Sequence, residues 1–76
     1  MLIIIMMGEE PLVSLDVAVD EEIYVIKQLI ESQSNIPAAE ISLSYNGLEL
    51  ISGTLASKGV SDNDIISLVR KAARQM

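Results

Sequence analysis

The fold is decided by residues 12–30, LVSLDVAVDEEIYVIKQLI, in which the hydrophobic pattern changes its period. Over residues 12–19 apolar side chains alternate with Ser14, Asp16 and Ala18, which is typical of a half-buried strand. This pattern would place Val13, Leu15, Val17 and Val19 on one side of the strand. From residue 23 onward the apolar positions instead recur at helical spacing. The stretch therefore predicts a strand followed directly by a helix.

The predicted helix carries one apolar stripe, formed by Ile23, Ile26 and Ile30 with Lys27 on the same side. The acidic run at residues 20–22 suits a helix start, where free N–H groups and the dipole favour carboxylates. We interpret this run as capping and not as a catalytic carboxylate pair, because no feature of the sequence indicates a cleft. The helix should end near Ser34-Asn35, since Pro37 disfavours helical geometry at Ile36.

Working outward, residues 1–7 are an apolar run rich in β-branched side chains, which predicts a strand. Gly8-Glu9-Glu10-Pro11 then predicts the turn of a hairpin with residues 12–19. Ile41, Leu43 and Tyr45 alternate with serines before Asn46-Gly47, a strong hairpin signal that leads into a short strand at 48–50. Leu55 should fill the core under a turn of helix. The last strand should be 64–70, with Ile66 and Leu68 facing inward and Ile65, Ser67 and Val69 outward.

Composition restricts the function. Half of the residues are hydrophobic and mean hydropathy is +0.42, which excludes a disordered chain. The longest apolar run is too short for a membrane helix and lacks the flanks of a secretory signal. The chain has no Cys and no His, so thiolate chemistry, disulfides and the commonest metal ligand are absent. The net charge of −6 and the scarcity of aromatic residues argue against nucleic-acid binding. We expect a monomeric, intracellular binding module without cofactor, membrane or nucleic-acid partner, and not an enzyme.

The element order β-β-α-β-β-β resembles the ubiquitin-like β-grasp, an α+β fold in which a mixed sheet packs on one helix. The resemblance covers residues 1–70, with 71–76 as a tail or the start of a linker. Besides the strand and helix patterns, it is carried by Ile36-Pro37, Leu43-x-Tyr45-x-Gly47, Leu50, Gly53-Thr54-Leu55 and Ile66-x-Leu68-Val69.

Three further motifs are similar to the N-terminal ubiquitin-like domain of the DNA-damage-inducible shuttle proteins. They are Glu40-Ile41, Tyr45-Asn46-Gly47 and Gly59-Val60-x-Asp62-x-Asp64-Ile65. That resemblance implies a larger cytoplasmic or nuclear parent with a retroviral-type aspartic protease domain. The 76 residues contain no Asp-Thr/Ser-Gly motif, so catalysis would lie elsewhere in the parent. The resemblance to the shuttle proteins also implies protein partners: ubiquitin, ubiquitin-binding domains or proteasome receptors.

Two departures from ubiquitin qualify this resemblance. The tail 70–76, RKAARQM, has no Gly-Gly, so we expect a built-in domain and not a conjugated modifier. Ubiquitin-like domains bind partners through an apolar patch on the exposed sheet face, but here serines occupy central positions, which predicts weak binding. The expected partner-binding face comprises Met6, Met7, Ser42, Ser44, Gly47, Leu48, Ser67 and Val69. Other apolar surface should lie near it, at Ile4 and Ile65.

Other functions remain as alternatives or are disfavoured. A β-grasp scaffold or dimerisation module outside the ubiquitin pathway stays open, although the basic strand edge of Ras-binding domains and the clustered acidic motif of PB1 domains are missing. Asp62-Asn63-Asp64 begins like a calcium loop but lacks the later ligands and the glycine, so it predicts a turn. Lys27 on the apolar stripe must pair with a carboxylate or extend to solvent.

Overall fold

The computed structural model describes residues 1–71. Its helices and strands follow the predicted order β-β-α-β-β-β, with two short 3-10 turns, one of them the turn of helix expected beside Leu55. The elements are β1 (Leu2–Met7), β2 (Glu10–Asp16), α1 (Ile23–Ser34), η1 (Ala38–Glu40), β3 (Ile41–Tyr45), β4 (Leu48–Glu49), η2 (Ala56–Lys58) and β5 (Asp64–Arg70). The described part of the chain contains no helix long and apolar enough to cross a membrane.

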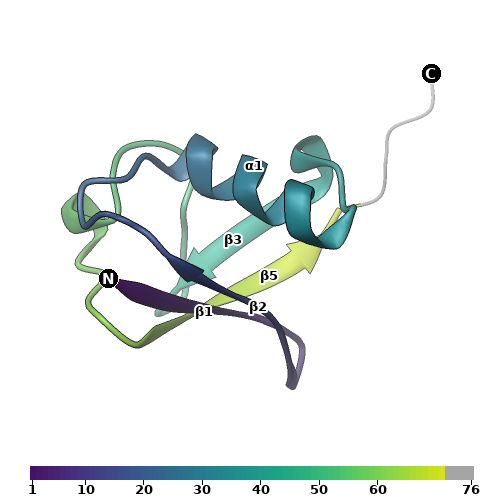
Figure 1. The fold of residues 1–76 in the computed structure, drawn as a ribbon, viewed down its shortest axis with the longest axis horizontal. Coiled ribbons are helices and arrows are strands. Elements are labelled where there is room, and N and C mark those ends of the chain that lie inside the picture. Colours follow the sequence, from purple (N-terminus) through teal and green to yellow (C-terminus); the bar gives the residue numbers. More distant parts are fainter. Residues whose placement is uncertain (72–76) are drawn as a thin grey trace.

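The five strands form one mixed sheet in the order β2-β1-β5-β3-β4. The two strands at its centre, β1 and β5, are parallel, whereas the other neighbouring pairs are antiparallel. The helix lies across one face of this sheet and leaves the other face open (Figure 1). The α+β β-grasp predicted from the sequence is therefore confirmed.

The core lies between α1 and the sheet. The helix contributes Ile23, Ile26 and Ile30, all fully buried as the stripe predicts. The last strand has its predicted bounds, and Ile66 and Leu68 point inward while Ile65, Ser67 and Val69 are exposed. Leu55 is fully buried just before η2, so it fills the core as expected. The remaining buried side chains are Ile3, Ile5, Leu15, Val17, Ile36, Ile41, Leu43, Leu50 and Val60.

The prediction for the second strand was wrong at both ends. The strand β2 begins at Glu10 and contains Pro11, which pairs with Met6 beside a register shift that leaves Leu12 as an extra residue. Because β2 is an edge strand, a proline without an N–H is tolerated there. The strand ends at Asp16, and the chain then turns through a bond from the Glu21 N–H to the Ala18 carbonyl. Val19 is consequently 57% exposed and not part of the inward row.

The capping role predicted for the acidic run 20–22 was also wrong. Glu22 precedes the helix, but its side chain makes no capping hydrogen bond, and the first turn holds no acidic residue. Its backbone instead forms a bridge with Thr54, and the Ile23 N–H donates to the Gly53 carbonyl at 2.9 Å. A backbone carbonyl from a distant loop thus accepts the first N–H of the helix. The predicted end is confirmed, because Asn35 adopts φ 64° and its N–H donates to the Glu31 carbonyl.

The hairpin predicted from Asn46-Gly47 is confirmed. Both residues have positive φ, 53° and 82°, as a type I′ turn requires. The strand after the turn is one residue shorter than expected, since β4 ends at Glu49. Leu50 is nevertheless fully buried, and its N–H donates to the Leu43 carbonyl at 2.8 Å.

Candidate protein-binding face

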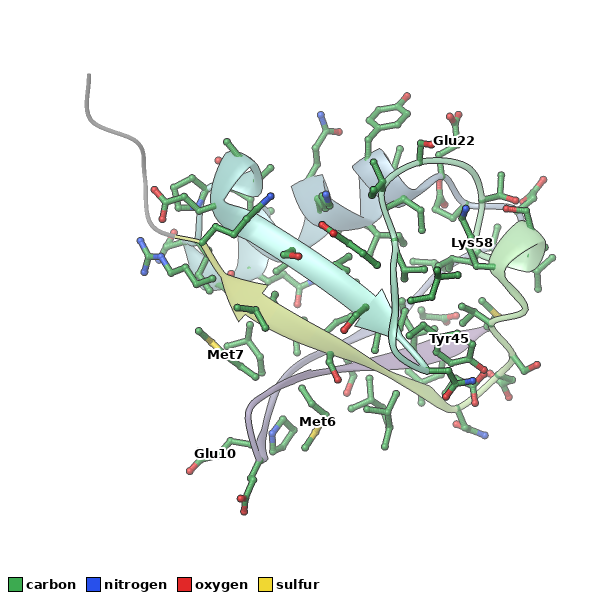
Figure 2. All side chains as sticks on the ribbon, turned by 180° about the vertical axis from the view of Figure 1, so that it is seen from behind. Met6, Met7, Glu10, Glu22, Tyr45 and Lys58 are labelled. Carbon is green, nitrogen blue, oxygen red and sulfur yellow. The ribbon has the colours of Figure 1, made fainter. Side chains whose placement is uncertain are left out.

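The open face of the sheet, opposite α1, is the candidate site, and Figure 2 views the molecule from this side. Strand pairing places its side chains in rows. Ser42 of β3 lies opposite Val69 of β5, and Ser44 lies opposite Ser67. Ser67 is in turn the parallel partner of Met6 on β1. Five of the eight residues expected from the sequence therefore share one face and lie side by side.

These five residues differ in how much surface they offer. Val69 is 62% exposed and Ser67 is exposed, whereas Ser42, Ser44 and Met6 are half-buried. The Ser42 hydroxyl donates a hydrogen bond of 3.1 Å to the carboxylate of Glu49 on β4. The part of the face over β3 is therefore polar, and one of its hydroxyls already has a partner.

The other three expected residues lie at the margins of this face. Leu48 pairs with Tyr45, so by strand alternation it belongs to the opposite side of the sheet, although it is 58% exposed at the edge. Glu49 is the residue that stands across from Ser44. Met7 pairs with Leu68 and Glu10 at the end of β1, near the hairpin labelled by Glu10 in Figure 2. Gly47 forms the exposed β3–β4 turn.

The structure places three further apolar residues on the open face: Ile4 and Ile65, which the sequence predicted near it, and Leu2, which it did not. Leu2 and Ile4 alternate with the inward Ile3 and Ile5, so they share the side of Met6. Ile65 is the parallel partner of Ile4. Leu2 is 38% exposed, Ile65 is 55% exposed and Ile4 is half-buried. Alternation along 1–7 and 64–70 indicated their side of the sheet, but only the pairing of β1 with β5 shows that they are neighbours.

Acidic side chains lie at two borders of the open face. Asp16 pairs with Leu2 across β1 and β2, and the Asp62 carboxylate accepts the Leu2 N–H at 2.6 Å. Glu49 borders the face at β4, whereas Glu10 pairs with Met7 and by strand alternation belongs to the other side of the sheet. Asp16 also lies 3.3 Å from the Met1 ammonium but remains 88% exposed. A binding partner would thus meet negative charge at the Leu2 end of the face and at its β4 edge.

The basic residues that the structure describes lie away from the centre of this face. Lys27 is on α1, and it is half-buried with no ion pair inside the described part of the chain. Lys58 is on η2, which Figure 2 shows away from Met6 and Met7. Arg70 is at the end of β5, where its Nε donates to Glu40 at 2.8 Å, and Lys71 follows it. The described lysine and arginine side chains therefore lie outside the centre of the open face.

A polar contact fixes the loop that leads into β5. The Tyr45 hydroxyl donates to the Asp64 carboxylate at 2.6 Å, and the Ser61 N–H donates to the same oxygen at 2.7 Å. The bond from Tyr45, followed by that from Ser61, holds the pKa of Asp64 below its ordinary value, and the same contact raises the pKa of Tyr45. Residues 62–64 thus form the predicted turn. Residues 1–71 hold no group of three side chains that could ligate a metal.

These features define a β-grasp domain with an open, partly apolar sheet face. The sequence profile of the ubiquitin family matches residues 3–73, and the chain belongs to that family. It is also similar to Protein DNA-DAMAGE INDUCIBLE 1 of Arabidopsis thaliana, with 36% identity over 70 residues. The match covers 91% of this chain but only 17% of that relative. A ubiquitin-like domain of this kind is a non-catalytic module.

Proposed function

We propose that this chain is a built-in ubiquitin-like domain of a larger proteasomal shuttle protein. In this role it binds ubiquitin, a ubiquitin-binding domain or a proteasome receptor through the open face of its sheet. Residues 1–70 form the domain, and residues 71–76 are a tail or the start of a linker. The parent protein acts in the cytoplasm or the nucleus and carries an aspartic protease domain of the retroviral type elsewhere.

The observation that carries this proposal is the open face itself. An apolar surface on a rigid sheet, bordered by acidic side chains, suits a protein partner that presents apolar residues among basic ones. The similarity to a relative of which this chain would cover only 17% favours a domain within a longer protein. The serines over β3 predict that binding is weak.

A titration followed by nuclear magnetic resonance tests the proposal. The ¹⁵N-labelled chain would be titrated with unlabelled ubiquitin, whose partner-facing surface includes basic residues, at about 0.01 M and about 0.15 M salt. Residues 1–69 contain two lysines and eleven acidic residues, a balance of −9, so attraction should weaken as salt screens it. We expect shifts confined to the open face and weaker binding at the higher salt.

Three results would count against this function. Affinity that is equal at both salt concentrations would remove the electrostatic argument, and shifts confined to α1 would remove the proposed face. The absence of any shift at millimolar ubiquitin would contradict ubiquitin binding. In that case concentration-dependent sedimentation of the chain alone would favour the alternative, a β-grasp dimerisation module.

A further inference from the structure

The apolar part of the open face lies where β1 pairs with β5, whereas the serines lie where β5 pairs with β3. Four neighbouring apolar side chains form it: Leu2, Ile4, Met6 and Ile65. We call these four residues the Ile4 stripe. Ile4 is its centre, because it has Leu2 and Met6 on its own strand and Ile65 directly across on β5. Adjacent strands are about 4.8 Å apart, so these side chains form one continuous surface.

The Ile4 stripe is held rigidly. It lies on β1, which is paired on both sides, with β2 and with β5. The inward neighbours Ile3 and Ile5 are fully buried. At the start of the strand, the backbone of Leu2 donates to Asp62 at 2.6 Å and accepts the Asn63 N–H at 2.7 Å. A surface fixed in this way loses little conformational freedom when a partner binds.

The region over β3 is less suited to be the energetic centre. Ser67 and Ser44 interrupt the apolar surface between Met6 and Glu49. An apolar partner group placed there would desolvate hydroxyls without replacing their hydrogen bonds, which costs free energy. It would also have to accommodate the bond between Ser42 and Glu49.

We propose that the Ile4 stripe is the anchor of the binding face and that its partner is a protein surface with an apolar centre surrounded by lysine or arginine. The acidic neighbours Asp16 and Asp62, at the Leu2 end of the stripe, supply the matching charge. The same acids would repel a second copy of this chain and an anionic membrane. This inference rests on the proposed function, since it locates the anchor within the proposed face.

Three matched substitutions test the location, with ubiquitin as the probe. Ile65→Thr removes apolar surface from the stripe but keeps a β-branched side chain that suits a strand. Ile51→Thr is the control, because Ile51 is 70% exposed and lies outside the sheet. Val69→Thr changes the exposed apolar residue beside Ser42. Thermal unfolding of each variant would verify that the fold is retained.

We expect Ile65→Thr to weaken ubiquitin binding about five- to tenfold, as loss of a central anchor does. Val69→Thr should have a smaller effect, and Ile51→Thr should stay within about twofold of the unchanged chain. If ubiquitin binds but Val69→Thr loses more affinity than Ile65→Thr, the anchor lies around Val69, where β5 pairs with β3, and only this inference is overturned. The proposed function fails, and this inference with it, if ubiquitin does not bind. The same holds if the NMR signals of the Ile4 stripe change with the concentration of this chain in the absence of ubiquitin.

Discussion

Leu43 and Ser44 are adjacent on β3 but point to opposite sides of the sheet, so substituting each should separate stability from binding. Leu43 is fully buried between the sheet and α1, whereas Ser44 is half-buried on the open face across from Ser67 and Glu49. Leu43→Ala should reduce the free energy of unfolding, and Ser44→Ile should change binding. A shift of the pairing register by one residue would reverse both expectations.

The magnitudes follow from burial. Removing a buried leucine side chain and leaving a cavity costs about 2–5 kcal/mol. A domain of this length has a total stability of about 4–11 kcal/mol. The melting temperature of Leu43→Ala should therefore fall by roughly 10–20 °C or more. Ser44→Ile should change stability by less than about 0.5 kcal/mol, because its side chain stays on the surface.

For binding, the added isoleucine would place new apolar surface on β3, with Ser67 between it and Met6. Its burial by a ubiquitin-associated or ubiquitin-interacting partner is worth about 1–2 kcal/mol, or roughly five- to thirtyfold in Kd. The assay pairs thermal unfolding with a binding titration on the same samples. The assignment of the open face would be refuted if Ser44→Ile unfolded the domain, or if it left affinity unchanged while Leu43→Ala proved harmless.

Three further predictions concern the loops and the sheet ends. Because the Tyr45 hydroxyl lowers the pKa of Asp64, the stability from this contact is present above the carboxyl pKa of the unfolded chain and is lost as pH falls through the pKa of the folded chain. Tyr45→Phe should therefore make the free energy of unfolding depend less on pH in the acid range. An unchanged dependence would contradict the role of this contact. Gly47→Ala should cost about 1 kcal/mol in chemical denaturation, because φ is 82° while nothing lies within 4 Å of an added Cβ; D-alanine there should cost nothing. Glu40→Gln breaks a half-exposed ion pair and should cost at most about 1 kcal/mol, an effect that should shrink in salt-dependent melts.

Local chemistry explains which parts of the fold could be predicted from the sequence. The β3–β4 turn was predictable because Asn46 and Gly47 tolerate positive φ, and β5 was predictable because its alternation is regular. The position of the α1 start was predicted, but its cap was not, because the group that satisfies the Ile23 N–H is the Gly53 carbonyl, thirty positions along the chain. A contact between two segments so far apart in the chain leaves no pattern in the sequence of either segment.

The candidate face shows the same division. Alternation separated the inward from the outward residues of β5, but the neighbour of each outward residue depends on strands far apart in sequence. The contact between Ile4 and Ile65 arises from parallel pairing of the first and last strands, which alternation alone does not reveal. The placement of Leu48, in contrast, was accessible. A two-residue turn pairs Tyr45 with Leu48, and this pairing puts Glu49 opposite Ser44.

Glu49 connects the polar and the charged features of the open face. Its carboxylate accepts the Ser42 hydroxyl and also carries negative charge at the β4 border. A partner that places a lysine or arginine beside Glu49 gains a charge pair there. A partner that covers β3 with apolar groups alone must bury this carboxylate without compensation, which is costly. The serines and Glu49 therefore act against purely apolar partners, while the Ile4 stripe provides the attractive contact. Specificity on this face would arise from both contributions.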